Sequence, residues 1–95
     1  MPKEIKYTEY FKDRLIFREI PDYIAKEVLT QSEERYYDNE TNRNIAVHEV
    51  KYGGEFRFLM VAYEEYEDYI QAITIHEIKK TQIVDRIKSG RWIPL

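Results

Sequence analysis

One histidine and three arginines supply the side chains that phosphate chemistry requires. An imidazole exchanges a proton near neutral pH, and a guanidinium binds anionic oxygens through a rigid fork of donors. These residues are His76, within a stretch rich in Ile and Thr, and Arg57, Arg86 and Arg91. Side chains of these types are candidates for binding a phosphate group and moving a proton, and neither task requires a metal.

Each of these residues also has a structural interpretation, which the sequence leaves open. Strand alternation places His76 on one face with Ile70, Ala72, Thr74 and Ile78. A structural, half-buried imidazole is therefore one alternative. Arg57 and Arg86 are alternatively solvated charges of a strand and a helix. Arg91 precedes the single tryptophan, Trp92, whose large indole favours packing on a sheet.

Charge is distributed unevenly along the chain. The formal net charge is −3, but residues 79–95 carry +4 and the first 78 residues carry −7. The charged residues of this C-terminal segment are Lys79, Lys80, Asp85, Arg86, Lys88 and Arg91. The distribution excludes a uniformly basic nucleic-acid binder and permits a local basic face that follows phosphates. A solvated C-terminal helix is the alternative.

The sequence contains no pattern typical of a metal or cofactor site. The absence of cysteine excludes disulfides, thiolate metal ligands and cysteine nucleophiles. The His-Glu pairs at 48–49 and 76–77 each offer one ligand to a given site, because adjacent strand residues face opposite sides. We therefore expect no cofactor and no bound metal. The acidic tract from Glu64 to Asp68 is interpreted as a solvated turn, with cation binding as the alternative.

Residue patterns predict one α+β domain over residues 1–95. Apolar residues recur at helical spacing from Tyr7 to Ile20, with Thr8 as a cap, and Pro21 suits the first turn of a second helix. Two helices are thus expected over 7–31.

A sheet and a last helix are expected after these two helices. β-type residues predict four strands within 34–78, with a tight turn at Gly53-Gly54. Their short connections favour a four-stranded antiparallel meander. Thr81 can cap a helix over 81–89 that ends at Gly90. We expect all three helices on one face of the sheet, with the other face partly open.

The expected core and interface follow from this arrangement. The predicted core residues are Ile24, Val28, Leu29, Phe58, Met60, Ile73, Ile75, Val84 and Ile87. Nine tyrosines and a candidate edge strand at residues 35–38 favour a homodimer or a partner interface.

No apolar run approaches the ~20 residues that span a bilayer, and no signal-peptide core is present, so we expect a cytoplasmic protein without membrane contact.

The order of the elements and several residues together resemble the small toxin-like domains of the RelE/ParE superfamily, in particular its uncharacterised short members. The residues that carry this resemblance are Arg14, Arg18, Ile20, Ile73, Thr74, Ile75, His76, Gln82, Arg86, Ile87, Gly90, Arg91 and Trp92. The resemblance covers nearly the whole chain and depends on the residues as an ordered set.

The resemblance implies an activity and partners. Characterised members are ribosome-dependent RNA endonucleases or gyrase poisons that a paired antitoxin protein silences. It therefore implies RNA as a substrate, an antitoxin as a partner, and His76, Arg57, Arg86 and Arg91 as the catalytic set. Two alternatives remain from other classes: a binding module of the same fold without catalysis, and a homodimeric protein without either role.

Overall fold

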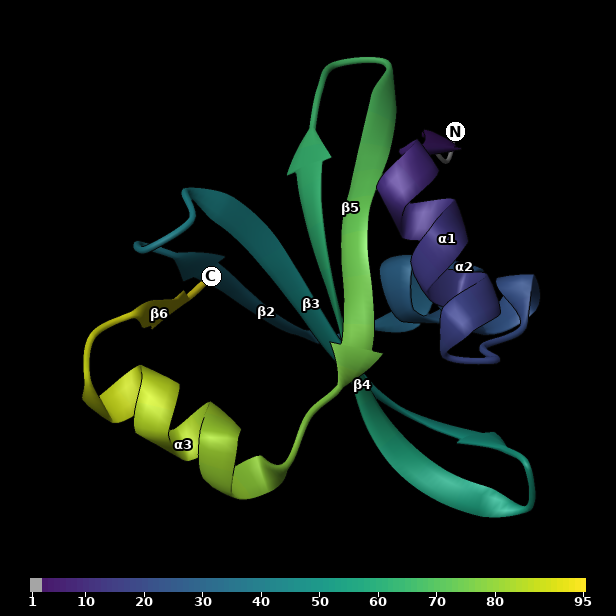
Figure 1. Cartoon of the computed structure of the whole chain (residues 1–95). Coiled ribbons are helices and arrows are strands. Elements are labelled where there is room, and N and C mark those ends of the chain that lie inside the picture. The colour runs from purple at the N-terminus through teal and green to yellow at the C-terminus, as the bar shows by residue number, and fades with distance from the viewer. Residues whose placement is uncertain (1–2) are drawn as a thin grey trace.

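A six-stranded sheet forms the middle layer of the structure, a computed structural model that describes residues 3–95 (Figure 1). The elements along the chain are β1 (Glu4–Tyr7), α1 (Glu9–Phe17), α2 (Asp22–Gln31), β2 (Glu34–Asp38), β3 (Arg43–Tyr52), β4 (Glu55–Glu65), β5 (Tyr69–Glu77), α3 (Lys80–Lys88) and β6 (Trp92–Pro94). The strand order across the sheet is β1-β5-β4-β3-β2-β6. The structure is therefore α+β, as its sequence pattern predicts.

The predicted four-stranded antiparallel meander is wrong, because two further short strands extend the sheet. β1 pairs with β5 in parallel, and β6 pairs with β2 in antiparallel orientation. The four residues of β1 and the three of β6 are too few to show a period of two, and tertiary pairing alone makes them strands. The segment Arg35–Asp38 is consequently not an edge strand, since β2 lies between β3 and β6.

Local sequence signals account for the predicted turn and for the first helix. Gly53 and Gly54 have φ angles of 62° and 79°, and they join β3 to β4 where glycine, without a Cβ, meets no steric penalty. The expected cap of α1 is also confirmed, because the backbone N–H of Phe11 donates to Thr8 Oγ1 at 3.1 Å.

The start of α3 differs from its predicted start. Lys79, not Thr81, is the residue at the N-cap position. Its backbone N–H donates to the side chain of Gln82 at 2.9 Å, so this glutamine satisfies one of the amides that a helix start leaves free.

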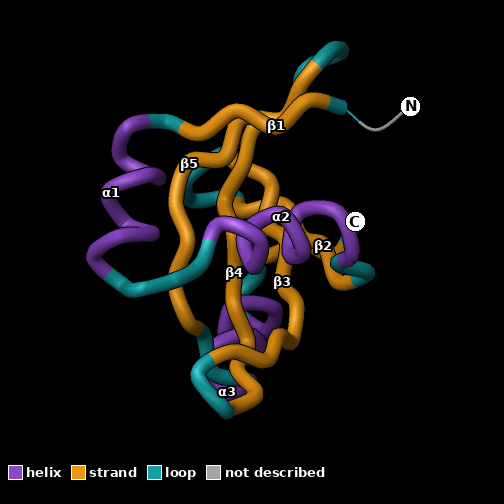
Figure 2. Tube along the Cα trace, turned by 90° about the vertical axis from the view of Figure 1, so that its right-hand side faces the viewer, coloured by secondary structure: helices purple, strands orange, loops and turns teal. Residues whose placement is uncertain are grey.

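The helices cover both faces of the sheet, so the expectation that all three share one face is wrong. α1 and α2 pack on the face that includes Val50, Leu59 and Ile75. α3 covers part of the opposite face, where Ile83 joins Met60 in a second cluster. Figure 2 shows α2 in front of the strands and α3 behind them.

The observed core differs from the predicted core mainly at α3. Five predicted residues are buried, namely Ile24, Val28, Leu29, Met60 and Ile75, while Phe58 and Ile73 are half-buried. Val84 and Ile87 are 45% and 36% exposed, so their predicted burial is wrong. The reason is that α3 contacts the sheet through the side that carries Ile83 and Arg86.

Two further expectations concern the chain's relation to membranes. Within residues 3–95, no helix is long and apolar enough to cross a bilayer. The expectation about an N-terminal signal falls partly on residues 1 and 2, which lie outside the described residues. A cytoplasmic location stays a prediction.

Truncation of Leu59 should destabilise the fold strongly. The side chain is fully buried beneath α1 and α2, so we expect Leu59→Ala to lower the free energy of unfolding by about 2–5 kcal/mol. Urea denaturation measures this change. Val84→Ala on exposed α3 surface is the control, with an expected change within about 0.5 kcal/mol. Equal losses in the two variants would contradict the assignment of the core.

Candidate functional site

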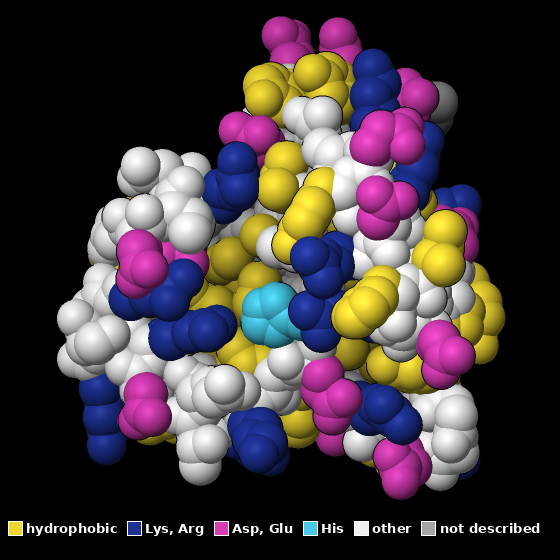
Figure 3. Space-filling view, in the orientation of Figure 1, with side chains coloured by type: hydrophobic (Ala, Val, Ile, Leu, Met, Phe, Trp, Pro, Cys, Tyr) yellow, Lys and Arg dark blue, Asp and Glu magenta, His cyan; other side chains and the backbone are white. Residues whose placement is uncertain are grey.

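A small hollow opens on the face of the sheet that α3 partly covers. Its volume is about 120 Å³, and the residues that line it include Asp38, Arg43, Met60, Thr74, His76, Arg86, Arg91 and Trp92. We call it the His76 hollow. Figure 3 shows a histidine near the middle of this face, with Lys and Arg side chains on both sides and a recess lined by hydrophobic side chains next to it.

A β-bulge in β5 brings His76 to this face. Ala62 pairs with Thr74 whereas Tyr63 pairs with Ala72, so Ile73 is one extra residue in the strand. Ala72 therefore packs in the core beneath α1 and α2, while Thr74 and His76 line the opposite face. The predicted face shared by His76 with Ile70 and Ala72 is wrong, because regular alternation does not continue across the bulge.

The hydrogen bond of His76 defines which nitrogen can accept a proton. Nδ1 lies 2.9 Å from the carbonyl oxygen of Glu77, which can only accept, so Nδ1 carries the hydrogen and Nε2 carries the lone pair. Burial lowers the pKa of His76 below its usual range; the hydrogen bond to the Glu77 carbonyl opposes this shift, and the nearby charges of Arg18 and Arg86 add to it. At neutral pH the imidazole is therefore mostly neutral, in the state that a general base needs.

Asp38 is a buried carboxylate that holds one side of the hollow together. The residue is only 2% exposed, and its oxygens accept hydrogen bonds from Arg91 at 3.1–3.3 Å and from Trp92 Nε1 at 3.1 Å. The backbone N–H groups of Glu40 and Thr41 also donate to it. Burial raises the pKa of Asp38, but these hydrogen bonds outweigh burial and lower the pKa to about 2.

Trp92 forms the apolar wall next to Asp38. It is 1% exposed and stacks on Tyr36, with ring centroids 5.2 Å apart. Its expected packing on the sheet is confirmed, and the second role of its indole, as a donor to Asp38, explains how the polar N–H is accommodated there.

Arg86 and Arg91 differ in how their charges are neutralised. Within residues 3–95, Arg86 makes no ion pair; its guanidinium lies 4.9 Å from the centroid of the Trp92 ring, and Nη1 lies 3.8 Å from Met60 Sδ. Arg91 instead pairs with Asp38 at 3.1 Å and with Glu40 at 3.4 Å. The hydrogen bond to Asp38 raises the pKa of Arg91. Arg86 is thus available to a ligand, as is Arg43, which also lines the hollow and has no ion pair within residues 3–95, whereas Arg91 is held by Asp38 and Glu40.

Arg57 does not lie with the other three predicted residues. It pairs across the sheet with Val50, on the face beneath α1 and α2, and its guanidinium lies 3.0 Å from Glu55 and 3.6 Å from Glu77. The structure therefore brings His76, Arg86 and Arg91 together and leaves Arg57 on the opposite face of the sheet.

Two residues that line the hollow, Asp38 and Arg43, are not among the site residues predicted from the sequence. Asp38 ends a tyrosine-rich strand and resembles an ordinary turn residue, so only its pairing with residue 92 gives it a role. Arg18, which follows α1, does not line the hollow, but its charge lowers the pKa of His76. A chain without cysteine and with two histidines also offers little to a metal, and within residues 3–95 no group of three or more acidic or histidine side chains could hold one.

No family model, curated protein or solved structure matches this chain. Its resemblance to the RelE/ParE superfamily therefore stays a prediction, and the function must be argued from the geometry of the His76 hollow.

Replacement of Asp38 should destabilise the protein in a pH-dependent way. A folded-state pKa of about 2, below the usual ~3.9, corresponds to about 2–3 kcal/mol of stability at neutral pH, so Asp38→Asn should lose roughly that amount. Because the folded pKa is depressed, this contribution is complete above about pH 4 and disappears as the pH falls toward 2. Urea denaturation of both proteins between pH 7 and pH 2 measures it, and a difference independent of pH would contradict the role of the charge. Asp85→Asn on exposed α3 surface is the matched control.

Proposed function

We propose that this chain is a metal-independent RNA endonuclease, of the toxin-like type that its sequence resembles, and that it acts at the His76 hollow. The observation that carries the proposal is an imidazole, whose Nε2 makes no hydrogen bond within residues 3–95, in one small hollow with three arginines, Arg43, Arg86 and Arg91. These are the groups that cleavage of an RNA strand by its own 2′-hydroxyl requires.

The size of the hollow supports a phosphate as its occupant. Sites for whole small molecules usually measure about 300–1,000 Å³, whereas this one measures about 120 Å³. It has room for a phosphodiester group while the bases remain outside. Single-stranded RNA, whose backbone is accessible and whose bases can turn away, suits such a site.

His76 has the position and state of the general base in this proposal. Its Nε2 takes the proton of the 2′-hydroxyl, the 2′-oxygen forms a bond to phosphorus, and the bond from phosphorus to the 5′-oxygen breaks. The leaving oxygen takes a proton from water, and the hydroxide that remains takes the proton from the imidazolium. The products are a 2′,3′-cyclic phosphate and a 5′-hydroxyl, and His76 returns to its neutral form.

Arg86 and Arg91 stabilise the charge that develops on the phosphate. Arg86 has no acidic partner within the described chain, so its full charge can act on the non-bridging oxygens. In Arg91, Asp38 binds Nε and Nη2 but leaves Nη1 for a ligand. Fixed donors of this kind need little reorganisation when the charge forms.

His76→Ala should remove most of the activity and leave the fold intact. Loss of a general base typically lowers turnover by about 10²–10⁴-fold. Cleavage of a fluorescent single-stranded RNA in EDTA, with and without ribosomes, measures the rate, and the cyclic phosphate identifies the reaction. His48→Ala, the other histidine, lies outside the hollow and should retain activity. Arg86→Gln should lower turnover without unfolding the protein.

The outcomes of this experiment separate the candidate functions. If the wild-type protein cleaves no RNA under either condition, the nuclease proposal fails, and a binding module without catalysis becomes the better account. Equal loss of activity in the His48 and His76 variants would place the base elsewhere. A large fall in the melting temperature of His76→Ala would support a structural role for the imidazole.

The rate of cleavage should depend on the protonation of His76. Because burial and two arginines lower its pKa, the rate constant should rise with pH along an acidic limb centred below ~6.5 and then level off. Single-turnover measurements between pH 4.5 and 8 test this profile. A midpoint above the usual histidine range, or no acidic limb in a protein that stays folded, would contradict His76 as the base.

A further inference from the structure

The outer end of β3 is an open strand edge. β2 pairs with β3 only as far as the pair Glu34–Val47, whereas β3 continues to Tyr52. Over residues 48–52 the described chain supplies a strand neighbour on the β4 side only. Figure 1 shows the β3–β4 hairpin extending beyond the other strands. An open edge of this kind can pair with another chain.

The unpaired backbone groups of this edge can be assigned to particular residues. The carbonyl oxygen of Val47 points to the β2 side, where it accepts a hydrogen bond from Ser32 Oγ at 2.5 Å. Because backbone groups alternate along a strand, the N–H and C=O groups of Glu49 and Lys51 point to the same side. Both residues are exposed, and the described chain places no strand beside them on that side, so their backbone groups can pair with a partner strand.

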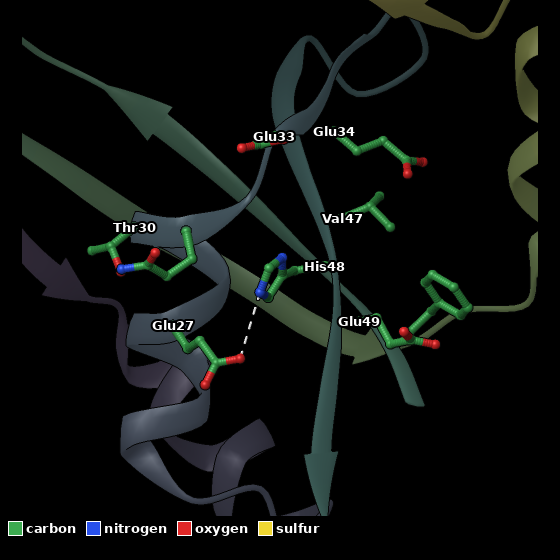
Figure 4. A pocket seen from close by; sticks show the side chains of 9 residues that line it. Glu27, Thr30, Glu33, Glu34, Val47, His48 and Glu49 are labelled. Atoms are coloured by element: carbon green, nitrogen blue, oxygen red, sulfur yellow. Dashed lines mark ion pairs between the residues drawn. The ribbon is translucent and has the colours of Figure 1, made fainter. Parts of the chain in front are cut away.

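A broad groove of about 740 Å³ accompanies this edge, between the end of α2 and β3. We call it the β3 groove. Its ionisable lining residues are Glu27, Glu33, Glu34, His48 and Glu49, and among its described lining residues there is neither Lys nor Arg. Figure 4 shows Glu27 and Glu49 on either side of β3, with Glu33 and Glu34 beyond the end of α2. The pair of His48 and Glu27, 3.5 Å apart, marks the α2 side.

We propose that the β3 groove binds an extended, Lys- or Arg-rich segment of a partner protein, which adds to the sheet as a strand beside β3. The accessible groups of Glu49 and Lys51 would supply main-chain hydrogen bonds, and alternate side chains of the segment would meet the carboxylates on the two faces. The stretch from residue 48 to 52 accommodates about five residues at roughly 3.3 Å each.

Charge selects this occupant over a second copy of the same chain. Two copies paired at this edge would bring two sets of four glutamates together, and like charges at close range destabilise an interface. A basic segment neutralises the same carboxylates and pairs with the same backbone groups. The groove and the His76 hollow have no lining residue in common, so this inference is independent of the proposed nuclease activity.

Fluorescence anisotropy with synthetic peptides tests the proposal. The probe is a capped, labelled heptapeptide of alternating lysine and valine, which should bind the full chain at low salt. The same peptide with every internal amide N-methylated keeps its charge and lacks the backbone donors, so it should bind at least tenfold more weakly. Amide hydrogen exchange should show new protection at Glu49 and Lys51 when the unmodified peptide binds.

Charge-reversal variants test whether the peptide binds to the carboxylates of the groove or responds only to the overall negative charge of the protein. Glu33→Lys combined with Glu49→Lys should weaken binding at least tenfold. The matched control is Glu67→Lys combined with Asp68→Lys, two exposed carboxylates in the turn before β5, and it should bind as the wild type does.

Four results would overturn the inference. They are the absence of saturable binding up to about 1 mM peptide, equal binding of the N-methylated peptide, an equal loss in the control variant, and a peptide-free dimer in which the same two amides are protected. The last result would assign the edge to a second copy of this chain.

Discussion

The buried carboxylate of Asp38 is the interaction on which the C-terminal part of the structure depends. It joins the end of β2 to Arg91 and Trp92, which are 53 and 54 residues away in the sequence. Burial of a charge costs several kcal/mol unless its hydrogen bonds are complete, and here five N–H groups complete them. The same hydrogen bonds that stabilise the buried carboxylate also fix β6 beside β2. α3, which lies between β5 and β6, is thereby held at its C-terminal end.

The position of α3 in turn determines the chemistry of the hollow. With Trp92 fixed by Asp38, the guanidinium of Arg86 lies over the indole and faces the recess beside His76. The bulge at Ile73 provides the other half of the arrangement, because it turns His76 out of the core and toward Arg86. One buried charge and one inserted residue thus bring together side chains from β5, α3 and the chain's end. Neither feature would position the site alone.

The elements with strong local residue patterns can be predicted from the sequence. The Thr8 cap of α1, the second helix after Pro21 and the Gly53-Gly54 turn follow from local physics. The predicted extent of the first helix is wrong, because Tyr7 belongs to β1, α1 ends at Phe17, and Ile16 and Phe17 are exposed. β1 and β6 depend on pairing with strands that are distant in the sequence. Their four and three residues are too few to show the alternation that predicts a strand. Of the residues that line the hollow, His76, Arg86 and Arg91 could be named as candidates from the sequence, although the same reasoning also named Arg57, which lies on the opposite face of the sheet. Asp38 could not be named, because its burial results from contacts with the other end of the chain.

Strand β3 relates the two surfaces to each other. Arg43, at its start, lines the His76 hollow, and Glu49, near its end, lines the β3 groove. Six residues of extended strand separate them by about 20 Å, more than twice the Debye length of about 8 Å at physiological ionic strength. The two surfaces come closer across the sheet, because Val47 of the groove pairs with Met60, and Met60 pairs with His76 of the hollow. Two strand spacings of about 4.8 Å separate Val47 from His76, which is close to the Debye length. The carboxylates near this part of the groove therefore offset some of the positive charge beside His76, whereas Arg43, at the other end of β3, is screened from Glu49. A chain of net charge −3 thus presents its cationic site mainly through arginines that lie far from the groove or are held by Trp92 and Asp38.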